Sequence, residues 1–189
     1  EGMPRHDLAK AKEYLAKSQW PDGGIELEYV YVQGLEEERK MGLVLIDSFK
    51  DINISVKMVP LTWPNMKARG SKVEAAPDML AMLATPVSAD PDAVAMQYHP
   101  SSWGQYTSTS FYDNPEVAAM IEKARFTVKW EDRAKIYADI QNQIVEDQPE
   151  IFGMMRERRI AFRDYVKGFT YTPVRMTTEL DYYPLHIGK

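Results

Sequence analysis

Two carboxylates, Asp90 and Asp92, are the residues whose types and spacing come nearest to catalytic chemistry. They flank Pro91 in the stretch ATPVSADPD, which covers residues 84–92. Paired carboxylates can serve as the acid and the base of a hydrolase. Asp-Pro-Asp is also a common turn and helix start, in which Asp90 caps and Pro91 takes the first helical position. The pattern favours the structural interpretation, and a small hydrolase stays open as an alternative.

Other catalytic and metal-binding patterns are missing from the sequence. There is no GxSxG motif, no phosphate-binding glycine loop and no HExxH motif. Cysteine is absent, which excludes thiol nucleophiles, zinc–thiolate sites and disulfides. The three histidines, His6, His99 and His186, lie far apart and show no ligand spacing. We therefore expect no catalytic residue, no metal site and no cofactor.

The composition is that of a globular protein. The 189 residues are enough for one ordinary domain or one large lobe, with 44% hydrophobic and 27% charged residues. The net charge of −5 argues against a nucleic-acid partner, because phosphate binding needs a concentrated basic patch. No apolar run approaches the roughly 18 residues of a membrane span.

The first sixty residues predict a helix followed by a β-α-β unit. Apolar spacing indicates a helix over residues 7–18, capped by Asp7. Residues 25–32 and 52–59 alternate as strands do, and residues 36–49 form an amphipathic helix between them. This order implies a parallel pair of strands with a right-handed crossover.

The rest of the chain predicts a third strand and several helices. Residues 78–83 predict a third strand, and after Asp78 they are continuously apolar, as expected at the centre of a parallel sheet. Asn114 and Pro115 begin a helix that ends near Arg125. The other expected elements are a short helix over 61–70, a helical turn over 92–98, a long helix over 130–146, strand-like residues 151–162 and a turn-rich tail over 166–185.

The stretch ATPVSADPD lies where ligands bind in open α/β sheets, beyond the carboxyl end of a strand. Its two prolines stiffen it, so ordering it costs little entropy. An uncharged segment with four aromatic residues follows, and such a segment suits a neutral ligand or a hydrophobic wall. The alternative is that these aromatics, Trp103, Tyr106, Phe111 and Tyr112, pack the protein's own core.

Four segments resemble the motifs of one family in order and spacing. They are DLAKAKEYLAKSQWPDG, in which Ser18-Gln19 replaces the usual Ala-Gly, then SFKDINISVKMVPLTW, FYDNPEVAAMIEKARFTVKWEDRAKIYADIQNQIVEDQPEIF and RRIAFRDYVKGF. The chain resembles the C-terminal lobe of the extracytoplasmic solute-binding proteins of ABC transporters, in family 5, the oligopeptide-, dipeptide- and nickel-binding receptors.

The resemblance implies an α/β fold, one lobe of a type II periplasmic-binding protein, with a mixed sheet and flanking helices. Two lobes of such a receptor close around a peptide-like or other small solute and present it to a membrane permease, in the periplasm or elsewhere outside the cytoplasm. Residues 1–156 would form the C-terminal ligand-binding lobe. Residues 157–189 would return to pack on an N-terminal lobe that this sequence does not contain, so a dimer formed through the tail is a further expectation. A ligand-sensing receptor on the same fold is the alternative.

The resemblance also suggests where the ligand lies. In the family, the segment matching ATPVSADPD lines the cleft, and in peptide binders its first Asp pairs with the ligand's amino group. Val87 takes that position here and Ala84 replaces a Trp, so the resemblance argues against ordinary peptide recognition unless Asp90 serves instead. The candidate ligand-binding residues are Ala84, Thr85, Val87, Ser88, Asp90, Trp103, Met155 and Arg156. The last two match the hinge, where a core methionine and a solvated charge run are the alternatives.

Overall fold

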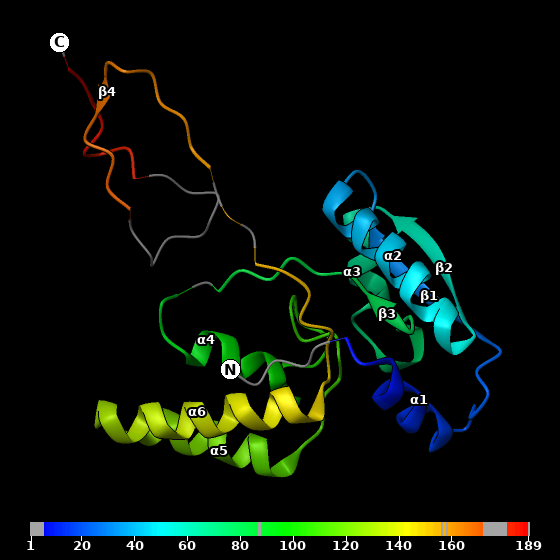
Figure 1. The fold of residues 1–189 in the computed structure, drawn as a ribbon. Coiled ribbons are helices and arrows are strands. Elements are labelled where there is room, and N and C mark those ends of the chain that lie inside the picture. The colour runs from blue at the N-terminus through cyan, green and yellow to red at the C-terminus, as the bar shows by residue number, and fades with distance from the viewer. Residues whose placement is uncertain (1–5, 87, 156, 158, 172–180, 189) are drawn as a thin grey trace.

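The computed structural model describes residues 6–86, 88–155, 157, 159–171 and 181–188. Figure 1 shows three parts along the chain. We call them the α/β body (residues 8–80), the helical subdomain (residues 92–147) and the C-terminal arm (residues 159–171 and 181–188). The arm runs away from the other two parts, which lie side by side.

The α/β body is built around a three-stranded parallel sheet with strand order β2-β1-β3. β1 and β2 pair over their full length, from Ile25 opposite Ile54 to Val32 opposite Leu61. The elements are α1 (Leu8–Ala16), β1 (Ile25–Val32), α2 (Glu36–Phe49), β2 (Ile54–Leu61), α3 (Trp63–Arg69) and β3 (Met79–Leu80), with 3₁₀ turns at Lys50–Ile52 and Val73–Ala75. The predicted β-α-β unit and its parallel pair are confirmed.

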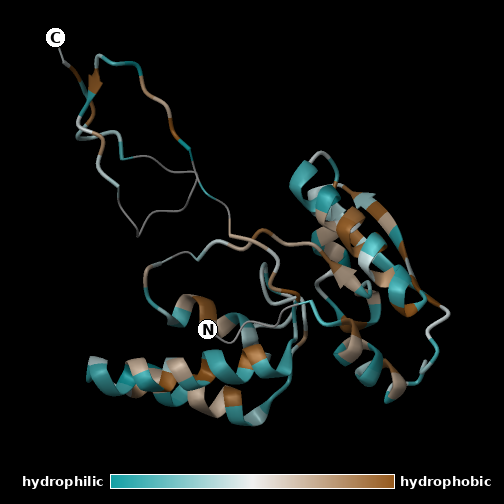
Figure 2. Ribbon diagram, viewed as in Figure 1, coloured by the Kyte–Doolittle hydropathy of each residue, from teal (hydrophilic) through white to brown (hydrophobic). Residues whose placement is uncertain are grey.

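Helix α2 approaches the sheet closely because Gly42 has no side chain. A Cβ at Gly42 would lie 2.7 Å from ring atom Cε1 of Tyr29 and from the methyl group of Met58. The core beneath α2 contains Tyr29, Tyr31 and Ala81, packed against methionine and aliphatic side chains. Figure 2 shows hydrophobic residues along the strands and hydrophilic residues on the outer side of α2. This packing fixes the carboxyl ends of the strands, where a ligand is expected.

Two strand predictions need correction. β2 begins at Ile54 and not at Ile52, because a 3₁₀ turn ends at Asn53 in the left-handed conformation, with φ of 56°. β3 contains only two residues, Met79 and Leu80, and it lies at the edge of the described sheet and not at its centre. A continuous apolar run reports burial on both faces, but it does not report how many backbone groups pair.

The helical subdomain has its own core between α5 (Pro115–Phe126) and α6 (Trp130–Asp147). Asn114 caps α5 as predicted, since its Oδ1 accepts from the backbone N–H groups of Glu116 and Val117. The apolar stripes of the two helices face each other, and short α4 packs on them. The subdomain also contains α4 (Asp92–Ala95) and the 3₁₀ turns Met96–Tyr98 and Pro100–Ser102.

The C-terminal arm contains one short antiparallel ribbon, β4 (Val166–Lys167) with β5 (His186–Ile187). Among the described residues of 151–162 no strand forms, so the strand-like prediction for this segment is wrong there. The arm exposes many large apolar side chains, among them Tyr165, Phe169, Tyr171, Tyr182, Tyr183 and Ile187.

Candidate functional site

The carboxyl ends of the three strands meet at one edge of the sheet. β1 ends at Val32 and β2 at Leu61, while β3 leads into residues 83–90, which we call the cleft loop. β2 and β3 lie on opposite sides of β1, so the order in which strands are added to the sheet reverses between β1 and β3. Such a switch point is where open α/β sheets bind ligands.

An aromatic pair stands beside the start of the cleft loop. Trp63 begins α3 directly after β2, and its ring meets that of Tyr106 edge to face, with centroids 5.5 Å apart. The hydroxyl of Tyr106 donates to the carbonyl oxygen of Leu83 at 3.2 Å. Lys67 Nζ lies 5.8 Å from the centre of the Tyr106 ring. The side chains of Trp63 and Tyr106 stay 40% and 38% exposed, so they offer an accessible apolar wall with a cation beside it.

A tight turn places Tyr106 against α3. Gly104 has φ of +73°, and a Cβ there would come within 2.2 Å of the carbonyl oxygen of Ser71. Only glycine fits so close a backbone contact at positive φ. Trp103, a predicted ligand residue, lies in the same turn, where its Nε1 donates to the carbonyl oxygen of Tyr112 and its ring meets Phe111. Trp103 is 38% exposed, so the turn holds it without burying it.

The cleft loop exposes several of the other predicted residues. Ala84 and Ser88 are exposed and Thr85 is half-buried, while Val87 lies outside the described residues. Ser88 Oγ accepts from the backbone N–H of Asp90 at 3.3 Å. Ala84 and Thr85 directly follow Leu83, whose carbonyl oxygen accepts the hydrogen bond from the Tyr106 hydroxyl.

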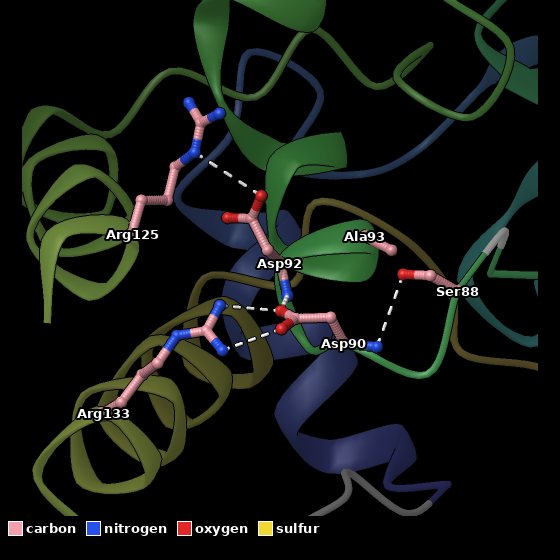
Figure 3. A pocket seen from close by; sticks show the side chains of 6 residues that line it. All are labelled: Ser88, Asp90, Asp92, Ala93, Arg125 and Arg133. Carbon is pink, nitrogen blue, oxygen red and sulfur yellow. Dashed lines mark hydrogen bonds and ion pairs between the residues drawn. The ribbon is translucent and has the colours of Figure 1, made fainter. Parts of the chain in front are cut away.

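Asp90, at the end of the cleft loop, pairs with the helical subdomain (Figure 3). Both of its carboxylate oxygens accept from the guanidinium of Arg133 on α6, each at 2.7 Å. Asp90 Oδ1 also accepts from the backbone N–H of Asp92 at 2.8 Å, which starts α4. The Arg133 guanidinium, and then the Asp92 N–H, hold the pKa of the Asp90 carboxyl below its usual range. Asp90 is thus charged and already paired.

A second ion pair lies beside the first. Arg125 of α5 approaches Asp92 at 3.5 Å, and the hydroxyl of Tyr137 donates to the same carboxylate at 3.3 Å. The two ion pairs border a hollow of about 320 Å³, which Ser88 and Ala93 also line. Its two arginines and two aspartates pair with each other, so the hollow presents little uncompensated charge to a ligand.

Only one of the two hinge candidates, Met155, belongs to the described part of the chain. Met155 is 97% exposed, and Arg156 lies outside the described residues. Their predicted ligand contacts remain predictions. No group of three or more His, Cys, Asp or Glu side chains able to hold a metal occurs within the part of the chain that the structure describes.

Three contributors to this region were not among the predicted site residues. Trp63 and Lys67 flank the wall formed by Tyr106, and Arg133 takes the carboxylate of Asp90. The position of Trp63 directly after a predicted strand is a signal that could have identified it. No local signal identifies Arg133, because it lies 43 residues from its partner.

A family model described as bacterial extracellular solute-binding proteins, family 5, middle part, matches residues 1–106. The probable D,D-dipeptide-binding periplasmic protein DdpA of Escherichia coli (strain K12) is 25% identical over 183 residues. The match covers 92% of this chain and 35% of that protein, so the chain spans about a third of its relative's length.

Solved structures share the fold at low sequence identity. The periplasmic binding protein DppA from Helicobacter pylori, in complex with the peptide STSA, has a TM-score of 0.74 at 20% identity and covers 97% of this chain and 35% of its own. A dipeptide-binding protein from Pseudoalteromonas sp. SM9913, in complex with Met-Leu, has a TM-score of 0.74 at 17% identity, over 100% and 37%. AgaA from A. tumefaciens R10, in complex with agropinic acid, has a TM-score of 0.73 at 24% identity, over 87% and 33%. The predicted α/β fold of the periplasmic binding proteins is confirmed.

Proposed function

Because the chain belongs to the bacterial extracellular solute-binding proteins of family 5, we propose that it is the C-terminal ligand-binding lobe of an ABC-transporter receptor. The receptor captures a peptide-like or other small solute between two lobes and delivers it to a membrane permease. The observation that carries this proposal is the family match over residues 1–106, which include the sheet, the cleft loop and the aromatic pair.

The same proposal divides the chain into two regions that meet after residue 156. Residues 1–156 form the lobe, and residues 157–189 pack on the N-terminal lobe of the receptor. The exposed aromatic and aliphatic side chains of the C-terminal arm support this division, since large apolar surfaces of this kind usually contact another domain or chain. A dimer formed through the arm is the alternative occupant of that surface.

We place the ligand at the carboxyl ends of the strands. Ala84, Thr85, Trp63 and Tyr106 border this surface, and Trp103, Ser88, Met155 and the residues at 87 and 156 complete the candidate set. Asp90 contributes through the loop it anchors, because its carboxylate is paired with Arg133. A free carboxylate for a peptide's amino group is therefore missing from the described part of this loop, which supports a ligand other than an ordinary peptide.

The geometry supports a receptor more than a hydrolase. A general acid needs a raised pKa, whereas the hydrogen bonds from Arg133 lower the pKa of the Asp90 carboxyl. Asp92 is engaged by Arg125 and Tyr137. We propose that neither residue is catalytic.

The receptor would work outside the cytoplasmic membrane. The family is described as extracellular, and the DdpA relative is described as periplasmic. Within the described residues, no helix is both long and apolar enough to cross a bilayer. Nucleic acid is not a proposed partner, in keeping with the net charge of −5.

A thermal-shift screen of the full-length receptor tests the function and the ligand class together. The panel contains L- and D-dipeptides, oligopeptides, oligosaccharides, opines and metal chelates. A true ligand at a hundredfold excess over its Kd adds about 2.7 kcal/mol of stability. A hit among non-peptides supports the proposal in full, a hit among L- or D-peptides overturns the ligand class, and turnover of any compound overturns the receptor assignment.

A further inference from the structure

The cleft loop has few supports of its own. No helix or strand forms over its described residues, and Ala84, Pro86, Ser88 and Ala89 are exposed. Its first residue is held where the carbonyl of Leu83 accepts from Tyr106. Its last residue is held where the carboxylate of Asp90 accepts from Arg133. The place of the exposed residues between them depends on these two anchors.

Contacts within the helical subdomain hold the Arg133 side chain independently of Asp90. Its Nε donates to the carbonyl oxygen of Ala124 on α5 at 3.2 Å, and one terminal nitrogen donates to the hydroxyl of Tyr137 at 3.1 Å. The guanidinium also lies over the Tyr137 ring, 5.1 Å from its centre, and the side chain is 18% exposed. A planar guanidinium held on several sides can present two donors to a carboxylate in one orientation only.

A second set of contacts lies beside the Asp90–Arg133 pair. Asp92, two residues beyond Asp90, receives Arg125 from α5 and Tyr137 from α6. α5 and α6 form a helical hairpin, and both helices therefore contact the end of the cleft loop and the start of α4. The hairpin itself does not need this contact, because its core of Val117, Ile121, Ile140 and Ile144 is formed between α5 and α6.

We propose that Arg133 is a positioning residue, which sets the place of the cleft loop, and hence the affinity of the ligand surface, from a helix that does not line that surface. This inference rests on the proposed function for its ligand-binding part. It predicts that loop and hairpin move as one unit, and that freeing Arg133 loosens the loop while the hairpin stays folded.

Amide hydrogen exchange of this chain tests the positioning role without any ligand. The informative amides are those of Asp92 and Ala93, which donate to the side chain and the carbonyl of Asp90. Arg133→Gln should speed their exchange by about tenfold, and Arg133→Lys should rescue only part of this loss because a lysine cannot bond both oxygens. The matched control is Lys135→Gln, an exposed cation on the same helix, which should change neither amide.

Three results would overturn the positioning role. One is unchanged exchange of Asp92 and Ala93 in Arg133→Gln. Another is an equal rise at Ile121 and Ile140, which would show that Arg133 merely holds the hairpin together. The third is a double variant Asp90→Asn/Arg133→Gln that adds the two single effects, since groups that act through one contact should not be additive.

Binding to the full-length receptor tests the consequence for the ligand surface. The probes are L-alanyl-L-alanine and D-alanyl-D-alanine, titrated into wild type, Arg133→Gln and Lys135→Gln. For a probe that binds wild type, we expect Kd to weaken about tenfold in Arg133→Gln alone, with the variant still folded by circular dichroism. An unchanged Kd overturns the proposal. If wild type binds neither probe, the result agrees with a ligand other than a dipeptide, and the exchange experiment alone decides the positioning role.

Discussion

Glu38 places a nearly buried carboxylate between β1 and α2. Its side chain is 2% exposed, and its Oε2 accepts from the backbone N–H of Val32 at 2.8 Å, at the end of β1. The Tyr29 hydroxyl donates to the Glu38 carbonyl oxygen at 2.7 Å. Burial raises the pKa of Glu38, and burial together with the nearby Glu38 charge raises the pKa of Tyr29 to about 12. One residue therefore fixes the turn from β1 into α2.

We predict that Glu38→Gln removes part of the pH dependence of stability. A carboxyl whose pKa is raised by folding binds more protons in the folded state, so its contribution is fully present below its ordinary pKa and is lost as pH rises through the folded pKa. Urea unfolding from pH 5 to pH 8 should therefore show a steeper fall in wild type than in Glu38→Gln. Glu150, whose pKa burial also raises, acts in both proteins and cancels in the comparison.

The matched variant Glu38→Ala separates the charge from the hydrogen bond. Glutamine can still accept from the Val32 N–H, whereas alanine leaves this half-buried donor without its partner. Glu38→Ala should therefore lose about 1–3 kcal/mol relative to Glu38→Gln at every pH. Equal stabilities of the two variants would contradict the assigned role of the contact.

At the scale of elements, the turn around Gly104 is a steric test of how α3 and the aromatic wall fit together. Gly104→Ala places a Cβ 2.2 Å from the carbonyl oxygen of Ser71 in addition to the strain of φ +73°. Gly34→Ala is its control, because Gly34 has φ of +92° but no atom within 4 Å of its added Cβ. We expect about 1–2 kcal/mol of destabilisation for Gly34→Ala and clearly more for Gly104→Ala, measured by chemical denaturation. Equal losses would show that the Ser71 contact yields freely.

The caps of α5 and α1 should differ in their effect on the whole protein. Asn114 caps α5, which is buried at Val117, Ile121 and Ala124, and its Nδ2 also donates to Asp147 at the end of α6. We expect Asn114→Ala to lower the free energy of unfolding by about 1 kcal/mol or more. Asp7→Ala removes the corresponding cap of α1, which has no buried residue, so only local fraying should follow. Circular dichroism during urea unfolding measures both, and an equal loss in the two variants would contradict this difference.

Local rules predicted the elements better than their partners. α2 and β1 have the predicted bounds because periodicity and flanking turns are local signals, and the cap of α5 is visible in Asn114-Pro115. The length and edge position of β3 were not predictable in this way, because pairing depends on distant strands. The cleft loop was located correctly after a strand, yet its pairing with Arg133 depends on how two parts of the fold pack.

At the scale of the whole molecule, the described residues form two separate cores. The core of the α/β body contains Tyr29, Tyr31 and Ala81, and that of the helical subdomain contains Ile121, Ile140 and Ile144 among others. Figure 1 shows that these two parts are joined by irregular segments of the chain. Cores divided in this manner can open independently.

We therefore predict that Ile140→Ala loosens one part only. Ile140 is 2% exposed, and truncation of such a side chain costs about 2–5 kcal/mol. Amide exchange should rise at Ile121 and Ile144, whereas the amide of Val30 in β1 should keep its protection. An equal rise at Val30 would show that the two parts unfold as a single unit.

The most direct test of the proposed receptor is a titration that compares two tryptophans, Trp63 and Trp130. The full-length receptor is titrated with the best compound of the thermal-shift panel in wild type, Trp63→Ala and Trp130→Ala. Trp130 is also partly exposed, but it begins α6 at the tip of the hairpin. If the ligand lies at the carboxyl ends of the strands, Trp63→Ala weakens Kd by about thirtyfold, equivalent to about 2 kcal/mol, while Trp130→Ala matches wild type. Equal affinities in wild type and Trp63→Ala, with both proteins folded, would contradict a ligand surface at this edge of the sheet.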